Sequence, residues 1–228
     1  MIAGIRERSY FIYHTSISVL GNMETCYSIR EMMQMISSAV ETIAETVPDW
    51  EGNQFVNTLL SASRIYVAGA GRSGLIAKAF AMRLMHLGME SYVVGETITP
   101  AMLEGDLLIV FSGSGETHSI TDICRTVKIV GGTLALITSR NESSMATVAD
   151  LKVVLDSRQY DDIGLSSDFA IRQITGEHRS GVAYNPKAPT GSLFETAAMI
   201  FSDAVILELM DLRHTATREV EDNYSNIQ

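Results

Sequence analysis

Two short segments rich in glycine and hydroxyl groups are the parts of the sequence best suited to chemistry. Residues 69–74 read Gly-Ala-Gly-Arg-Ser-Gly, and residues 112–117 read Ser-Gly-Ser-Gly-Glu-Thr. Each follows an apolar, β-favouring run and precedes a helical pattern, so each is predicted to open a helix at the carboxyl end of a strand. Glycine lets a backbone approach a bound group, and the unpaired amides of a helix N-terminus attract anions. Both segments therefore indicate an anion site.

The first segment also fits a dinucleotide. It matches the Gly-x-Gly-x-x-Gly fingerprint, and Glu96 follows the next predicted strand, where a ribose-binding acid is expected. An NAD-linked oxidoreductase is therefore one hypothesis, and a tight turn without a ligand is another.

The second segment is not required by a dinucleotide fold. The hydroxyls of Ser112, Ser114 and Thr117 suit the three terminal oxygens of a phosphate monoester, although Ser114 or Thr117 would also serve as a helix cap. Ligands of open α/β sheets bind at the carboxyl ends of the strands. Two such loops at one sheet edge favour a phosphorylated ligand over capping alone.

Strands that alternate with helices must position these loops. This alternation predicts a three-layer α/β/α fold with a parallel sheet covered on both faces. The strands are expected at 64–68, 92–94, 106–111, 133–138 and 151–155. The helices are expected at 23–47, 50–60, 73–87, 117–130, 143–149 and 192–212. No regular pattern covers 156–190, and a loop of that length is usually functional or mobile.

The sequence resembles a known family over more than the two loops. The runs 68–100, 106–117 and 191–210 resemble the sugar isomerase (SIS) family of phosphosugar-binding proteins, and within it the 6-phospho-3-hexuloisomerases. The resemblance implies a flavodoxin-like sheet of order 2-1-3-4-5 and a dimer or tetramer. It implies an enzyme that interconverts D-arabino-3-hexulose 6-phosphate and fructose 6-phosphate through a cis-enediol(ate), without a metal or a redox cofactor.

The same resemblance assigns roles to single residues. Glu195 matches the catalytic base, and the competing interpretation is a capping box with Ser192. Glu96 and Thr97 are expected to line the sugar. The residues expected at the phosphate are Gly71, Arg72, Ser73, Ser112, Gly113, Ser114 and Thr117.

Two histidines are candidates for the group that moves a proton between the sugar oxygens. His86 lies in the resembling run but is equally suited to a core or interface. His214 ends the last predicted helix, where it would act from its own or a neighbouring subunit, or would only complement the helix dipole. His178, in the 156–190 loop, would be a third candidate if that loop closes over a substrate of its own or of a neighbouring subunit.

Composition limits the remaining alternatives. The net charge is −10, from 17 Lys and Arg against 27 Asp and Glu, which disfavours nucleic acid as a partner. No apolar run is long enough to span a membrane. Cys26 and Cys124 lack metal spacing and are expected to be reduced thiols of a cytoplasmic protein. One domain is expected at 23–215, between an extension at 1–22 and a tail at 216–228.

Three other functions stay open beside the leading one. One is an isomerase of another phosphosugar, such as arabinose 5-phosphate, and another is a non-catalytic SIS sensor. The third is the NAD-linked enzyme. A hexulose-phosphate synthase is the expected functional partner of the leading hypothesis.

Overall fold

A five-stranded parallel sheet forms the centre of the computed structural model, which describes residues 28–157, 193–214 and 217–224. The strand order is β2-β1-β3-β4-β5, and every neighbouring pair is parallel. The strands are β1 Ile65–Gly69, β2 Ser91–Val93, β3 Leu107–Phe111, β4 Thr133–Thr138 and β5 Leu151–Val154. The predicted fold class and strand order are confirmed.

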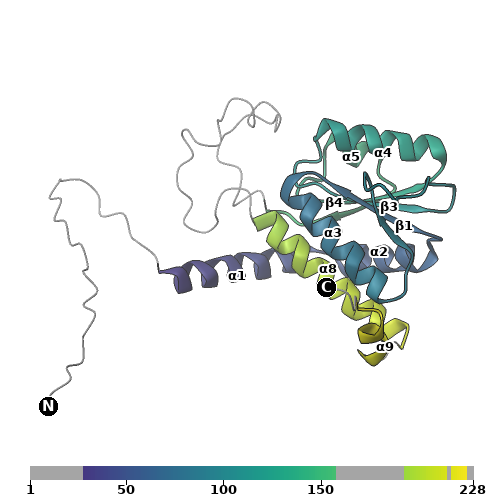
Figure 1. The fold of residues 1–228 in the computed structure, drawn as a ribbon. Coiled ribbons are helices and arrows are strands. Elements are labelled where there is room, and N and C mark those ends of the chain that lie inside the picture. The colour runs from purple at the N-terminus through teal and green to yellow at the C-terminus, as the bar shows by residue number, and fades with distance from the viewer. Residues whose placement is uncertain (1–27, 158–192, 215–216, 225–228) are drawn as a thin grey trace, which may run out of the picture.

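Helices cover both faces of the sheet and complete the three layers (Figure 1). The first four are α1 Ile29–Thr46, α2 Asp49–Ser61, α3 Gly71–His86 and α4 His118–Val130. The others are α5 Ser144–Val148, α8 Leu193–Leu212 and α9 Thr217–Asp222. α4 and α5 lie on one face, and α1, α2, α3 and α8 lie on the other. No helix within the described ranges is long and apolar enough to cross a bilayer.

Two hydrophobic cores separate these layers because successive side chains of a strand point to opposite faces. Ile109 of β3 packs in the larger core with α1, α2, α3 and α8, whereas Leu108 and Val110 pack in the smaller core under α4 and α5. All five residues of β3 are buried, as the uninterrupted apolar run predicts for a central strand.

The observed element ends differ little from the predicted ones. α3 begins at Gly71, two residues before the expected start, because its first turn already includes the glycine-rich loop. Ser28 and Glu31 form a capping box at the start of α1. The 1–22 extension, Ser192 and most of the 156–190 loop lie outside the described residues.

α8 lies beside α3 and runs in the same direction (Figure 1). Near their first turns, Ser73 Oγ donates a hydrogen bond to Glu195 Oε1 over 3.4 Å. At their last turns, Arg213 Nη1 donates to the carbonyl oxygen of Leu87 over 2.9 Å. The pair therefore spans the sheet from its carboxyl edge to its amino edge.

Candidate functional site

The first glycine-rich loop brings the start of α3 against the end of β1. A Cβ atom on Gly69 would lie 2.8 Å from the carbonyl carbon of Ser73, and one on Gly74 would lie 2.7 Å from the carbonyl oxygen of Gly69. Gly71 has a φ of +56°, a conformation that favours glycine. The three glycines therefore permit a tight passage from strand to helix, which leaves the first amides of α3 at the carboxyl edge of the sheet.

The helices that follow the two loops begin without a side-chain cap. Neither Ala70 before α3 nor Thr117 before α4 provides a cap hydrogen bond, and the first turn of each helix contains no acidic residue. By contrast, Ser28 caps α1 and Ser143 caps α5. The N-termini of α3 and α4 thus keep the unpaired amides and the partial positive charge that stabilise an anion.

The second loop is held through the carbonyl oxygen of Gly113. This oxygen accepts hydrogen bonds from Ser139 Oγ at 2.6 Å, from the Ser139 amide at 3.2 Å and from Thr138 Oγ1 at 3.3 Å. The C=O and N–H groups of a trans peptide point in opposite directions. The Ser114 amide therefore points away from β4.

The hydroxyls of this loop also shape it. Ser112 Oγ accepts a hydrogen bond from the Gly115 amide over 3.1 Å, and Ser114 Oγ accepts one from the Glu116 amide over 3.2 Å. Each hydroxyl keeps its own proton, so each still has a donor for a ligand.

Glu195 lies where α8 meets both loops. Its neighbour Phe194 is buried, and a Cβ atom on Gly113 would lie 3.0 Å from Phe194 Cδ1. On the other side, the Ser73 hydroxyl donates to the Glu195 carboxylate. The structure therefore brings together Ser73, Gly113 and Glu195, which the sequence places far apart.

Glu96 and Thr97 lie on the crossover between β2 and β3, and both are exposed. The Glu96 carboxylate pairs with Lys78 Nζ of α3 over 2.6 Å. Thr99 Oγ1 donates to the Val93 carbonyl over 2.5 Å and fixes the turn that contains Glu96 and Thr97. Arg72 is also exposed, at the start of α3.

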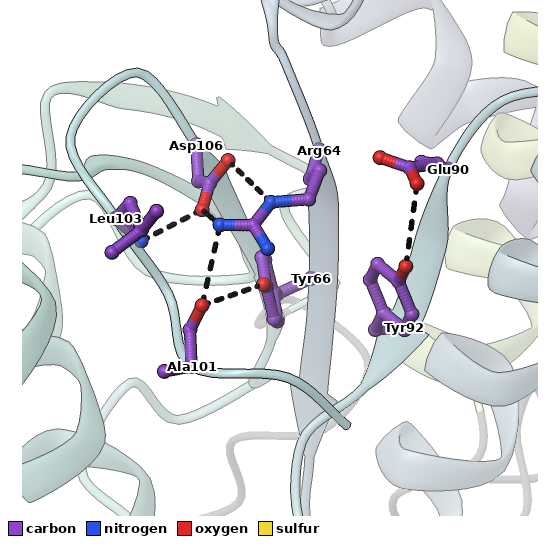
Figure 2. Close-up of polar contacts among 7 residues, drawn as sticks. All are labelled: Arg64, Tyr66, Glu90, Tyr92, Ala101, Leu103 and Asp106. Carbon is purple, nitrogen blue, oxygen red and sulfur yellow. Dashed lines mark hydrogen bonds and ion pairs between the residues drawn. The ribbon is translucent and has the colours of Figure 1, made fainter. Parts of the chain in front are cut away.

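The crossover, residues 94–106, contains no helix. Side chains from β1 and from the residues just before β1 and β3 hydrogen-bond to its backbone (Figure 2). Arg64 Nε and Nη2 donate to the two oxygens of Asp106 over 3.1 and 2.7 Å. The Ala101 carbonyl accepts from Arg64 Nη2 and from Tyr66 Oη, each over 3.2 Å, and Leu103 donates its amide to Asp106 over 2.7 Å. The segment that carries Glu96 and Thr97 is thereby attached to β1 and β3.

The Asp106 carboxyl remains ionised in this cluster. Burial alone raises the pKa of Asp106. The hydrogen bonds that Arg64 and the Leu103 amide donate, together with the positive charge of Arg64, lower the pKa by more than burial raises it. The net effect is a pKa below the ordinary value.

The two candidate histidines lie at the opposite edge of the fold from Glu195. At ~1.5 Å per residue, His86 is about 20 Å beyond Ser73 along α3, and His214 is about 28 Å beyond Glu195 along α8. The His86 ring contacts the Tyr224 ring at a centroid distance of 4.5 Å and an interplanar angle of 52°, and burial together with Arg83 lowers the pKa of His86. His214 is exposed and has a φ of 51°. This chain alone does not bring either histidine to Glu195.

Sequence reasoning missed several residues that hold the second loop and the crossover in place. Arg64 and Asp106 each directly precede a buried strand. Two opposite charges at equivalent positions could have indicated from the sequence that they pair. Ser139 directly follows β4 at the edge where the two loops end, which is a similar signal. The contact between Gly113 and Phe194 has no signal in the sequence. Within the ranges described, no three His, Cys, Asp or Glu side chains are grouped as metal ligands.

The fold and the site define a doubly wound α/β protein with two open helix N-termini and a carboxylate at one sheet edge. A family model described as the SIS domain matches residues 58–176. The chain belongs to the SIS-domain family.

Relatives within this family match nearly the whole chain. A Bacillus subtilis protein named 3-hexulose-6-phosphate isomerase is 36% identical over 198 residues, which cover 87% of this chain and 98% of the relative. A Methanocaldococcus jannaschii protein of the same name is 31% identical over 184 residues, which cover 80% and 88%.

Solved structures agree with this assignment. The crystal structure of a Methanococcus jannaschii protein, reported with an inferred function of 3-hexulose-6-phosphate isomerase, is 29% identical and superposes with a TM-score of 0.68. The aligned region covers 87% of this chain and 99% of the M. jannaschii chain. A hypothetical protein of 35% identity superposes with a TM-score of 0.72, with coverages of 87% and 97%.

Proposed function

We propose that this chain is a phosphosugar isomerase that interconverts D-arabino-3-hexulose 6-phosphate and fructose 6-phosphate. The observation that carries the proposal is the pair of uncapped helix N-termini beside Glu195. The relatives named 3-hexulose-6-phosphate isomerase, at 31% to 36% identity over most of the chain, support this substrate.

The phosphate of the substrate binds between the starts of α3 and α4. Ser73, Ser112, Ser114 and Thr117 supply hydroxyl donors, and the first amides of both helices supply the others. Gly71, Arg72 and Gly113 form the adjoining backbone. A phosphate site of this kind is compatible with a net charge of −10, because helix N-termini take the place of a basic patch.

Glu195 acts as the base. Conversion of the 3-ketose into the 2-ketose removes the proton at C2 and delivers one to C3, so a single carboxylate beside these carbons performs both transfers. The Ser73 hydroxyl orients this carboxylate by donating to Oε1. Glu96 and Thr97 line the sugar from the crossover.

A second group must move the proton between the O2 and O3 oxygens. His86 and His214 stay candidates only if an adjoining subunit supplies them, because neither reaches Glu195 within one chain. The proposal therefore includes a homo-oligomer, a dimer or a tetramer. The reaction exchanges oxidation states within the substrate, so the proposal includes no metal and no redox cofactor.

We further place the reaction in the ribulose monophosphate pathway of formaldehyde fixation, in the cytoplasm, after a hexulose-phosphate synthase. Residues 23–215 form the proposed single domain, with 1–22 and 216–228 outside it.

One assay tests the reaction directly. The purified chain is mixed with formaldehyde, ribulose 5-phosphate and a hexulose-phosphate synthase, and fructose 6-phosphate is measured by a coupled dehydrogenase. The expected result is fructose 6-phosphate that depends on the chain. A parallel reaction with arabinose 5-phosphate should give no product. Absence of fructose 6-phosphate, with the synthase active, would overturn the proposal.

Two variants separate the base from the phosphate site. Glu195→Gln should bind the phosphosugar but lose turnover, whereas Ser114→Asp should lose binding, because a carboxylate would repel the phosphate. Asp122→Asn, at a side chain 75% exposed on α4, is the control and should behave as the wild type. Turnover by Glu195→Gln would remove Glu195 as the base.

A further inference from the structure

The second loop turns its hydrogen-bond acceptors toward β4 and α5. The carbonyl oxygen of Gly115 accepts a hydrogen bond from the Met145 amide over 3.1 Å. The carboxylate of Glu116, which is the one acidic side chain of the loop, accepts a hydrogen bond from the Ser144 amide over 2.8 Å. The negative groups of the loop are therefore held on the side where α5 begins.

The Ser114 amide is directed to the opposite side. It has no hydrogen-bond partner within the part of the chain that the structure describes. β1 lies on the side of β3 opposite β4, so an amide that points away from β4 points toward the first loop. Gly69 pairs with Phe111, and Phe111 pairs with Ile137, so the three strands end at one level. The Ser114 amide is thus a donor on the side of the proposed phosphate site.

The direction of this amide depends on the Gly113 carbonyl, which belongs to the same peptide. Of the three hydrogen bonds that this oxygen accepts, the one from the Ser139 hydroxyl is the shortest, at 2.6 Å. Ser139 is 7% exposed, which limits the access of water that could replace the hydroxyl. Glycine restricts its own backbone little, so contacts outside the loop must fix the peptide. A rotated peptide would point its carbonyl oxygen, instead of its amide, toward the first loop.

We propose that Ser139 is a positioning residue for the phosphate of the substrate. Its hydroxyl holds the peptide between Gly113 and Ser114 with the amide toward the phosphate and the carbonyl oxygen away from it. Ser139 thereby sets the affinity for phosphate through the loop and not by contact with the substrate. This role rests on the proposed function, because it concerns the phosphate site of that function.

Steady-state kinetics test this role in Ser139→Ala. The phosphate group does not react, so its contacts stabilise the substrate and the transition state equally, and their loss raises KM without lowering kcat. One hydrogen bond to a charged group changes a binding constant about tenfold. We therefore expect KM to rise about tenfold, with kcat within about twofold of the wild type. The inhibition constant of inorganic phosphate, used as a competitor, should rise by the same factor as KM.

Two other substitutions at Ser139 isolate the hydroxyl. Ser139→Thr keeps the donor and should retain a KM within about threefold of the wild type. Ser139→Cys fills the same space but donates only weakly, so it should raise KM even if the alanine variant does not fold. Thermal unfolding shows which variants are folded at the temperature of the assay.

Ser202→Ala is the matched control. Ser202 is 3% exposed, and its hydroxyl donates to the Ala198 carbonyl over 2.7 Å within α8. The control therefore loses the same kind of buried hydrogen bond outside the two loops. Its KM and its inhibition constant for phosphate should equal those of the wild type.

The opposing outcomes separate this role from the proposed function. A folded Ser139→Ala variant with a wild-type KM and phosphate inhibition constant would overturn the role of Ser139 alone. A variant in which only kcat falls, or an equal rise of KM in Ser139→Thr and Ser139→Ala, would also overturn it. A wild-type chain that neither binds nor converts fructose 6-phosphate would instead overturn the proposed function, and the role of Ser139 with it.

Discussion

Replacing Gly113 with alanine tests how the second loop positions Glu195. The new methyl carbon would lie 3.0 Å from Phe194 Cδ1 and 3.2 Å from Cγ. Ordinary carbon contacts are ~3.5–4.0 Å, so the ring must move by about half an ångström. Phe194 is 3% exposed and has little space to move into. The start of α8, including Glu195, should shift with it.

The size of the effect follows from this overlap. An extra methyl in a well-packed site costs ~1–3 kcal/mol. For a chain of this length we expect a melting temperature lower by about 2–12 °C, at ~2–4 °C per kcal/mol. A misplacement of ~1 Å can reduce turnover about 100-fold, so the smaller shift here should reduce kcat about tenfold.

The measurements are thermal unfolding and the fructose 6-phosphate assay at one protein concentration. Gly52→Ala is the matched control, because a Cβ atom there meets nothing within 4 Å and alanine favours the helix. Adding Phe194→Leu to Gly113→Ala should restore part of the stability, since the two sites are in contact. Wild-type stability and turnover in Gly113→Ala would refute the reasoning, as would strictly additive effects in the double variant.

Two further predictions concern titrating groups. Asp106 has a lowered pKa in the folded chain, so its contribution to stability is full above the unfolded value of ~3.9 and is lost as pH falls through the folded value. In urea unfolding, the deficit of Asp106→Asn against the wild type should therefore shrink as pH falls from 7 to 3, and a constant deficit would contradict this. Burial raises the pKa of the Cys124 thiol to about 11. In a Cys26→Ser variant, Cys124 should thus react slowly with Ellman's reagent at pH 8 and rapidly after unfolding; rapid reaction of the folded chain would show that the thiol is accessible.

The sequence predicted the elements well because their signals are local. The apolar runs before 112 and 139 are buried strands, and glycine-rich loops follow the first and third strands. Such runs show burial on both faces but do not specify neighbours, so the strand order came from the family resemblance. The meeting of the two loops then follows, because parallel neighbours end at one edge.

The histidines show what the patterns left undetermined. The helical periodicity that places Glu195 near the start of one long helix and His214 just past its end also separates them by about 28 Å, at ~1.5 Å per residue. That distance was available from the sequence, but the two histidines became candidates through the family resemblance. The contacts of Arg64, Asp106 and Ser139 depend on how strands are arranged in three dimensions, which composition and spacing do not specify.

The contacts at the two ends of α8 also help to fix its position along the axis of α3. α8 is apolar on nearly all sides, and apolar contacts are less directional than hydrogen bonds. The bonds of Glu195 with Ser73 at one end and of Arg213 with Leu87 at the other therefore add two specific contacts that oppose a shift of α8 along α3. The Arg213 bond lies far from the sheet's carboxyl edge. By fixing the axial position of α8, it nevertheless helps to hold the Glu195 carboxylate beside the two loops.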